Sequence, residues 1–259
     1  MLGLISGTSE GKDILRELND FTDNIFVSTA TEYGGDLLRS YKYKVLNYKP
    51  LNIQEIIEAI KINKIKGIVD ATHPYATEVS KNIMEACEQC KIKYIRYERP
   101  SLLEKYEGYS NVHVIYSYDE LKEELRDIHG NILNTTGSKS INSIMALNLK
   151  NRIIHRVLPT LKVMQELDES EIEPENIVAI KGPISTQLNE AFIDEFQGKV
   201  MLTKDSGERG GLEEKILSCI EKKIDLFIIA RKKMNYPLEF NDIIELTEYI
   251  RRDETLYEN

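Results

Sequence analysis

Four side chains capable of proton transfer or polar binding stand close together in residues 70–76, which have the sequence Asp-Ala-Thr-His-Pro-Tyr-Ala. An apolar run at residues 65–69 precedes them, and a helical pattern at residues 76–90 follows. Because ligands of open α/β sheets bind beyond the carboxyl ends of the strands, this arrangement is typical of a ligand site. His73 could act as an acid or base near neutral pH, or could only cap its loop by hydrogen bonding, and the residue types leave both open.

The loop after the first expected strand is a second candidate. Residues 6–11, Ser-Gly-Thr-Ser-Glu-Gly, open a helix, where backbone N–H groups and the helix dipole suit a phosphate. The spacing differs from the G-x-G-x-x-G fingerprint, so a tight turn with a Ser or Thr cap is an equal alternative. The second strand ends in Ser28 and Thr29, which would tolerate a 2′-phosphate on a bound ribose, while Glu32 just beyond keeps the choice of ribose open.

Cations gather at strand ends in the second half of an otherwise acidic chain. The chain has 43 Asp and Glu against 34 Lys and Arg, a net charge of -9, so a positive edge is unexpected. The pattern predicts a local positive field for an anionic ligand, although chance placement of common residues in loops is the alternative. The residues concerned are Lys139, Arg156, Lys181, Lys204, Arg209 and Arg231.

The elements that position these loops alternate between short apolar runs and amphipathic stretches. Strands are expected at residues 2–6, 25–29, 44–46, 67–70, 94–97, 112–116, 132–135, 153–158, 177–180, 200–203 and 226–230. Helices are expected at residues 11–18, 34–40, 53–62, 76–90, 118–128, 140–147, 160–167, 186–196, 212–222 and 241–252. Such regular alternation predicts parallel, doubly wound sheets.

An irregular segment at residues 99–111 interrupts this rhythm and is the best domain boundary. We therefore predict an α/β protein with two Rossmann-like lobes, mainly parallel sheets and a cleft between the lobes. Residues 1–99 would form a dinucleotide-binding lobe and residues 100–237 a second lobe that binds substrate. Residues 238–259 would add a C-terminal helix that packs near the hinge between the lobes.

Composition excludes several classes of protein. No apolar run approaches the roughly 20 residues of a membrane span, and the acidic balance argues against a nucleic-acid surface. Cys87 and Cys90 have C-x-x-C spacing, but no second pair or His cluster completes a metal site. With three cysteines, the sequence indicates a reduced, cytoplasmic location.

Tyr118 and Lys122 have the spacing of the Tyr and Lys of short-chain dehydrogenases. They lie on a charged helix, however, and a solvent-exposed helix face explains both residues.

Taken together, the loops resemble the precorrin-6A reductase family of cobalamin biosynthesis, with residues 70–76 the most specific piece. The resemblance runs from Leu4 to about Tyr236. It implies a reductase that uses NADPH or NADH to reduce one ring double bond of precorrin-6A, or of its cobalt complex, to the 6B form. The substrate would be an anionic tetrapyrrole, in agreement with the cationic strand ends. The loops that carry the resemblance are residues 7–10, 28–34, 70–76, 96–100, 136–139, 181–183 and 203–207.

The resemblance and the strand-end rule together suggest roles for individual residues. The first loop departs from the family pattern, because Ser6 stands where many relatives have Gly, but Ser can still form the turn. The expected cofactor contacts are Gly7, Thr8, Ser9, Glu10, Ser28 and Thr31. The expected substrate contacts are Ser138, Lys139, Lys181, Lys204, Ser206 and Arg231. The candidate proton donors are water, His73, Tyr75 and Asp205, and no metal site is expected.

Two other functions compete with this prediction. One is a non-catalytic two-lobed protein that closes on an anionic small molecule. The other is a short-chain-type dehydrogenase, which would require one continuous sheet and would use Tyr118 and Lys122.

Overall fold

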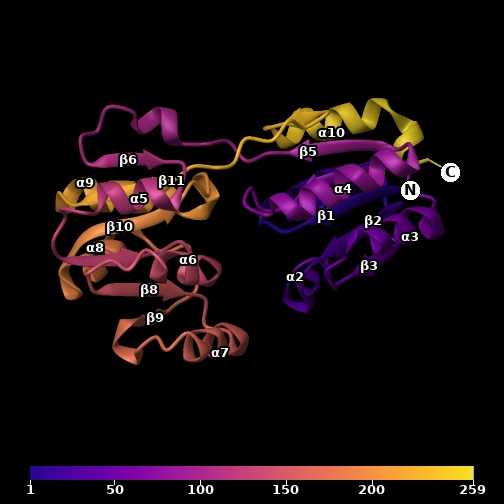
Figure 1. Ribbon diagram of the computed structural model, residues 1–259. Coiled ribbons are helices and arrows are strands. Elements are labelled where there is room, and N and C mark those ends of the chain that lie inside the picture. Colours follow the sequence, from indigo (N-terminus) through magenta and orange to yellow (C-terminus); the bar gives the residue numbers. More distant parts are fainter. Residues whose placement is uncertain (259) are drawn as a thin grey trace. The chain divides into compact units, whose positions relative to one another are not determined.

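The computed structural model describes residues 1–258 and contains two compact units, each with its own sheet and core (Figure 1). Unit 1 comprises residues 1–99 and the chain from Lys232 onward, and unit 2 comprises Pro100–Arg231. The sequence pattern predicts that residues 232–237 belong to the second lobe, whereas their contacts group them with unit 1. The reason is packing, since the ring of Tyr236 stacks on Tyr94 with a centroid distance of 6.2 Å.

The sheet of unit 1 has six strands, which all pair in parallel. Its order, β12-β5-β4-β1-β2-β3, matches the strand order of a Rossmann fold, with β12 in the sixth position. The order reverses between β1 and β4, and the loops after these two strands therefore meet at the switch point where such folds bind ligands. The strands are β1 (Leu2–Ser6), β2 (Ile25–Thr29), β3 (Val45–Asn47), β4 (Gly67–Ala71), β5 (Lys93–Tyr97) and β12 (Glu239–Phe240).

Helices cover both faces of this sheet. Leu15 and Ile250, from α1 and α10, share one apolar core, so the C-terminal helix packs on α1. The opposite core contains Ile56 and Ile83, from α3 and α4. Side-chain caps stabilise the N-termini of two of these helices, because Asn52 and Glu55 form a capping box on α3 and Asp242 caps α10. The helices are α1 (Glu10–Leu18), α2 (Glu32–Asp36), α3 (Ile53–Asn63), α4 (Thr77–Cys90), α10 (Ile243–Arg252) and the short η5 (Glu254–Leu256).

Unit 2 repeats the plan with a second six-stranded parallel sheet, in the order β6-β11-β10-β7-β8-β9. Its order reverses between β7 and β10, which makes the loops after these strands neighbours at a second switch point. The strands are β6 (Val112–Ile115), β7 (Asn131–Asn134), β8 (Ile153–Val157), β9 (Ile177–Ala179), β10 (Gly198–Lys204) and β11 (Asp225–Ile229).

The helices of unit 2 also lie on both faces. On one face, Ile193 of α8 and Ile216 of α9 pack against Met201, while Leu121 and Ile144 fill the other face. The α-helices are α5 (Tyr118–Glu124), α6 (Ile141–Met145), α7 (Leu161–Glu169), α8 (Thr186–Glu195) and α9 (Leu212–Lys222). Short helical turns are η1 (Leu103–Tyr106), η2 (Ser138–Ser140), η3 (Pro174–Asn176) and η4 (Glu208–Gly210).

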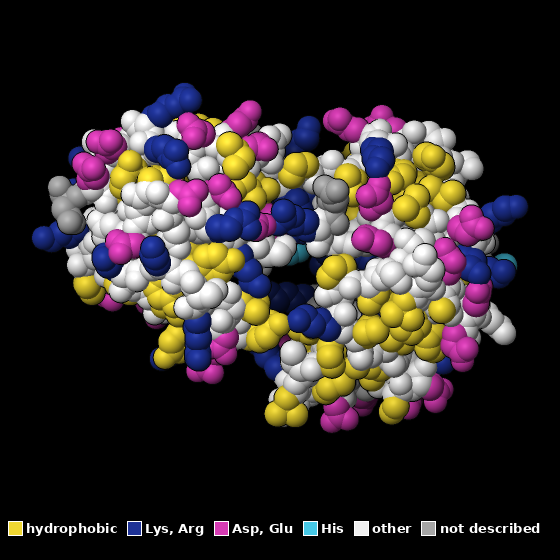
Figure 2. Space-filling view, turned by 180° about the vertical axis from the view of Figure 1, so that it is seen from behind, with side chains coloured by type: hydrophobic (Ala, Val, Ile, Leu, Met, Phe, Trp, Pro, Cys, Tyr) yellow, Lys and Arg dark blue, Asp and Glu magenta, His cyan; other side chains and the backbone are white. Residues whose placement is uncertain are grey.

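Two parallel sheets confirm the predicted α/β class and contradict the single continuous sheet that a short-chain-type dehydrogenase would require. The sequence does not predict β12, whose two residues carry no periodic signal, and α2 begins at Glu32, two residues before its predicted start. Among the residues described, we find no helix with the length and apolar character needed to cross a bilayer. On the face in Figure 2, Lys and Arg side chains are interspersed with Asp and Glu.

Candidate active site

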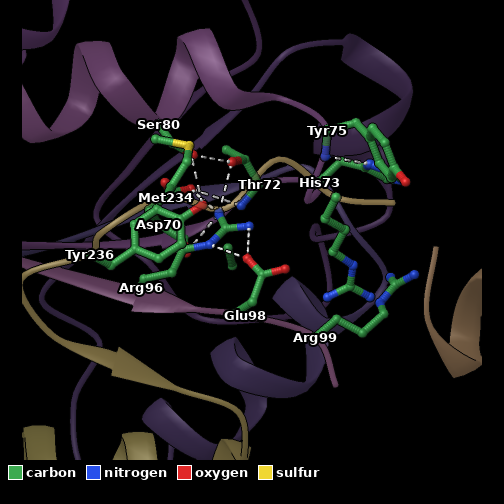
Figure 3. Close-up of polar contacts among 12 residues, drawn as sticks. Asp70, Thr72, His73, Tyr75, Ser80, Arg96, Glu98, Arg99, Met234 and Tyr236 are labelled. Atoms are coloured by element: carbon green, nitrogen blue, oxygen red, sulfur yellow. Dashed lines mark hydrogen bonds and ion pairs between the residues drawn. The ribbon is translucent and has the colours of Figure 1, made fainter. Parts of the chain in front are cut away.

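A buried ion-pair network supports the loop at residues 70–76. Asp70 of β4 and Arg96 of β5 face each other in the sheet register, and both are fully buried. Nη1 of Arg96 donates to Oδ1 of Asp70 at 2.9 Å, and Nη2 of Arg96 donates to Oε2 of Glu98 at 2.6 Å (Figure 3). Burial alone would lower the pKa of Arg96, but the charges of Asp70 and Glu98 outweigh it and raise that pKa.

Neutral groups complete this network and attach it to the start of the loop. The backbone N–H of Thr72 donates to Oδ1 of Asp70 at 3.0 Å, and the hydroxyl of Tyr94 donates to Oδ2 at 2.7 Å. Nη1 of Arg96 donates to the hydroxyl oxygen of Thr72 at 3.0 Å, and the ring of Tyr236 lies 5.2 Å from the guanidinium carbon. The network therefore fixes Thr72, and with it the position at which His73 enters the loop.

His73 and Tyr75 lie beyond this network and are partly exposed. The backbone N–H of Tyr75 donates to Nδ1 of His73 at 3.3 Å, which places the ring proton on Nε2 when the imidazole is neutral. Figure 3 shows the two rings side by side, and their centroids are 5.8 Å apart. Two of the predicted proton donors, His73 and Tyr75, are thus held at the carboxyl edge of the sheet with surface open to solvent.

The first loop is bonded directly to the end of β4. The backbone N–H of Gly7 donates to the carbonyl oxygen of Ala71 at 3.2 Å, and the hydroxyl of Thr8 donates to the same oxygen at 3.3 Å. A Cβ on Gly7 would lie 3.4 Å from the backbone nitrogen of His73. The two loops that the sequence singled out independently are therefore neighbours at the switch point of unit 1.

Two features of this first loop bear on whether a dinucleotide fits. Ser9, the N-cap of α1, caps no backbone N–H of the first turn, in contrast to the caps of α3 and α10, and its hydroxyl donates instead to Oε2 of Glu10 at 3.0 Å. A Cβ on Gly11 would lie 1.9 Å from Oγ of Ser6, so only glycine lets α1 approach β1 this closely. An uncapped helix N-terminus and a close helix-to-strand approach are what pyrophosphate binding requires, and the residues present fit that group.

Glu10 has a role in the structure that its sequence position did not reveal. Its carboxylate is 1% exposed, and Nε and Nη2 of Arg99 lie 2.5 and 2.6 Å from its two oxygens. Burial favours a raised pKa for Glu10, but the hydrogen bond and charge of Arg99 prevail and hold its pKa below the ordinary value. Arg99 thereby balances an acidic charge that would otherwise repel a phosphate at this helix end.

The other predicted cofactor residues lie at the end of β2 and already have partners. The hydroxyl of Ser28 accepts from Nδ2 of Asn47 at 2.9 Å, and Ser28 is 3% exposed. The hydroxyl of Thr31 accepts from the backbone N–H of Gly34 at 3.1 Å and caps α2. Thr31 and Glu32 are exposed at this strand end, so a ribose could contact both of them.

In unit 2, two of the predicted substrate-binding lysines are close neighbours. Lys139 follows β7 and is exposed, whereas Lys204 ends β10 and is half-buried. Burial and then the charge of Lys139 lower the pKa of Lys204, so the two ammonium groups interact across the second switch point. Ser138 and Lys139 also line a hollow of about 320 Å³, together with Asn142.

Asp205 and Arg231 bind each other. Nε of Arg231 lies 3.0 Å from Oδ2 of Asp205, which is 2% exposed, and the hydroxyl of Ser101 donates to the same oxygen at 2.8 Å. These contacts favour a positioning role for Asp205 over proton donation. The hydroxyl of Ser206 donates to the carbonyl oxygen of Gly210 at 3.1 Å.

Lys181 follows the edge strand β9 and is exposed. It therefore lies one strand beyond β8 in the sheet order, away from the β7–β10 switch point.

Arg96, Glu98 and Arg99 have no role among the sequence-based predictions. One signal was present, because an arginine inside the apolar strand at residues 94–97 requires a buried acidic partner.

The cysteine pair gives no sign of redox chemistry. All three cysteines are free thiols, and burial, followed by the charges of Cys90 and Asp70, raises the pKa of Cys87 to about 12. A thiol with so high a pKa is a poor nucleophile at neutral pH.

These features define an α/β protein of two Rossmann-like units, the first with a nucleotide-type switch point and the second with cations at its own. The chain belongs to the family Precorrin-6x reductase CbiJ/CobK, which it matches over residues 2–251. This membership confirms the resemblance drawn from the loops, and it favours a CH–CH oxidoreductase of cobalamin biosynthesis over a non-catalytic binding protein.

Individual relatives agree with this assignment. The chain is 36% identical to a cobalt-precorrin-6A reductase of Methanocaldococcus jannaschii, with 95% of this chain and 96% of the relative covered. It is 30% identical to a cobalt-precorrin-6A reductase of Priestia megaterium, at the same coverage. A solved structure described as CobK precorrin-6A reductase superposes with a TM-score of 0.76 at 14% identity, covering 100% of this chain and 99% of that one, which shows the shared fold.

Proposed function

We propose that this chain reduces one ring double bond of precorrin-6A, or of its cobalt complex, to the 6B form. The observation that carries the proposal is the direct bonding of the first loop to the His73 loop at the switch point of unit 1, in a chain of this reductase family. We place the activity in the cytoplasm, since all three cysteines are free thiols.

We propose NADPH or NADH as the reductant, bound by unit 1. A nicotinamide cofactor supplies a hydride when bound. Backbone N–H groups of Thr8 and Ser9, at the uncapped start of α1, would bind its pyrophosphate. Glu10 would act indirectly, because its carboxylate is committed to Arg99. Thr31 and Glu32 would contact the ribose, and their side chains decide whether a 2′-phosphate is accepted.

We propose that unit 2 binds the carboxylates of the tetrapyrrole. Lys139 and Lys204 lie together at its switch point, where burial first and then the charge of Lys139 lower the pKa of Lys204, and a bound anion would relieve this repulsion. Ser138 and Ser206 lie in the same two loops, and the Ser138 hydroxyl could donate to a carboxylate, whereas the Ser206 hydroxyl already donates to the carbonyl oxygen of Gly210. Lys181 lies farther from this pair, after the edge strand β9, and Arg231 is held in the ion pair with Asp205.

Reduction also requires a proton for the second carbon of the reduced bond. In the neutral tautomer that its contacts favour, His73 carries a proton on Nε2, and Tyr75 offers a hydroxyl beside it. The buried Asp70–Arg96 network holds the start of this loop, so orientation of the donor would come from groups that do not themselves touch substrate.

The decisive experiment mixes the purified chain with NADPH or NADH and with precorrin-6A, metal-free or cobalt-bound, and follows nicotinamide absorbance. We expect oxidation with at least one pairing, and the preferred pairing identifies both cofactor and metal state. Omitting the tetrapyrrole controls for background oxidation. No oxidation with any of the four pairings would overturn the proposal.

A further inference from the structure

Helix α9 buries a lysine on its apolar face. Lys215 is 5% exposed and shares that face with Leu212, Ile216 and Cys219, which belong to the core between the sheet and helices α8 and α9. Removing an ammonium group from water costs free energy unless a compensating charge or hydrogen bond is supplied. Lys215 therefore needs an explanation that helix packing does not give.

A second cation lies on the same face of the sheet. Arg156 is two residues after Ile154 on β8, and Ile154 packs in the core with Ile216, so both point toward α8 and α9. Nη1 of Arg156 donates to Oδ1 of Asn189 at 2.7 Å. Asn189 is 1% exposed, and its Nδ2 donates to the carbonyl oxygen of Ser185 at 2.9 Å, which fixes its orientation. Arg156 is thus held in place by a neutral amide.

The two cations repel each other. Burial, followed by the charge of Arg156, lowers the pKa of Lys215 to about 7. Burial likewise lowers the pKa of Arg156 to about 10. Glu214, the residue before Lys215 on α9, partly offsets this for Lys215, but among the residues described neither cation has a carboxylate within ion-pair distance. The fold therefore holds two positive groups together with too little negative charge.

A buried hydroxyl on the same face also lacks a partner within the described part of the chain. Thr203 is fully buried, and its Oγ1 makes no hydrogen bond. Thr203 is two residues after Met201, which packs in the same core, so its side chain points to the layer that contains Arg156 and Lys215. A buried hydroxyl left unbonded is costly, and an anion in this layer would accept from it.

All three residues lie near the carboxyl edge of the sheet, where ligands of such folds bind. Arg156 is the penultimate residue of β8, Thr203 the penultimate residue of β10, and Lys215 lies in the first turns of α9. Lys204, next to Thr203, already belongs to the cation pair at the switch point. Lys215, which is buried, and Arg156, which is partly buried, therefore extend the predicted carboxylate-binding edge inward.

We propose that Arg156 and Lys215, with Thr203, form the inner part of a subsite for one side-chain carboxylate of the tetrapyrrole. This inference rests on the proposed function and deepens it by naming residues that select the substrate. A carboxylate bound here accepts hydrogen bonds from the guanidinium of Arg156 and the ammonium of Lys215, and its negative charge balances these two cations. Both residues bind and position the substrate and take no part in hydride or proton transfer.

The first test compares Arg156→Gln and Lys215→Met with Lys222→Met, a lysine of the same helix whose ammonium bonds to Asp194 on the surface. We expect each subsite variant to raise KM for the tetrapyrrole by roughly 10- to 100-fold, because each removes a charged hydrogen-bond donor. The KM for the nicotinamide cofactor and kcat should stay near wild type, and Lys222→Met should match wild type throughout. Unchanged tetrapyrrole KM in both subsite variants of an active enzyme would overturn the subsite.

The second test uses the wild-type chain and so does not depend on the folding of variants. In protein labelled with ¹³C-lysine, the pKa of Lys215 is measured from its Cε shift, with and without saturating metal-free precorrin-6A. We expect binding to raise that pKa by at least one pH unit, and an unchanged value would refute the subsite. If the wild type oxidises no cofactor but this pKa rises, the proposed reductase function fails while the subsite stands.

Discussion

Asp70 and Arg96 face each other across β4 and β5, with Nη1 of Arg96 2.9 Å from Oδ1 of Asp70 and neither side chain reachable by solvent. Unit 2 repeats this geometry without charge, because Asn134 of β7 faces His155 of β8 and the two are bonded at 2.9 Å. In each unit the first residue of the pair also accepts from the backbone N–H two residues later. A facing pair thus anchors the loop at each switch point.

The charged pair in unit 1 predicts a large effect of a small substitution. Asp70→Asn keeps the shape of the side chain but leaves Arg96 with Glu98 as its one acidic partner among the described residues. We expect a loss of about 3 kcal/mol in the free energy of unfolding, measured by urea denaturation, because one member of a buried ion pair has been removed. Asp23→Asn breaks the exposed pair with Lys44 and should cost less than about 1 kcal/mol. Equal losses in the two variants would contradict this view of the network.

The close approach of α1 to β1 predicts a steric effect. Gly11→Ala would bring a Cβ within 1.9 Å of Oγ of Ser6, so we expect a loss of about 1–3 kcal/mol in unfolding free energy. Gly7→Ala meets nothing closer than 3.4 Å and should be nearly neutral. Adding Ser6→Gly to Gly11→Ala removes the atoms in conflict and should recover part of the loss, as a double-mutant cycle would measure. No recovery would show that the strain arises elsewhere.

His155 predicts acid sensitivity. Burial lowers its pKa to about 4, from an ordinary value of 6.5, so the folded chain binds fewer protons than the unfolded chain between these pH values. Folding stability should therefore fall as pH decreases from about 6.5 to about 4, with His155 contributing about 3 kcal/mol. Urea denaturation across this range should show a shallower decline in His155→Gln, while His129→Gln, at an exposed position, should follow wild type. Identical pH profiles for all three proteins would exclude this role of His155.

The proton donor can be identified by single-turnover kinetics. If His73 supplies the proton, His73→Gln should slow the decay of nicotinamide absorbance by about 10²-fold or more, the usual range for a general acid. Tyr75→Phe removes the neighbouring hydroxyl and is the matched test of the second candidate. Asp205→Asn should leave the rate of the chemical step near wild type, because that carboxylate is bound to Arg231 and Ser101. An unchanged rate in His73→Gln would assign the proton to Tyr75 or to water.

Local patterns in the sequence determined the class of fold and the loops that matter. Alternating apolar runs and amphipathic stretches predict parallel sheets because side-chain period follows secondary structure, and this holds without knowledge of which strands pair. Small residues after the first strand, the His73 loop and the cations at later strand ends were recognisable for the same reason, since each stands where one element ends and the next begins. The family resemblance followed from these loops.

Only the tertiary structure decided which loops meet and which charges are buried. Strand order joins the loop after β1 to the loop after β4, and the loop after β7 to the loop after β10, through pairings between residues far apart in the chain. The same long-range packing sets Arg96 against Asp70, commits Glu10 to Arg99 and returns Tyr236 to the first unit. Burial of Lys215 beside Arg156 likewise depends on how α9 lies on the sheet. Sequence periodicity specifies which face of an element is apolar, whereas partners across the fold depend on register and strand order, which no local pattern encodes.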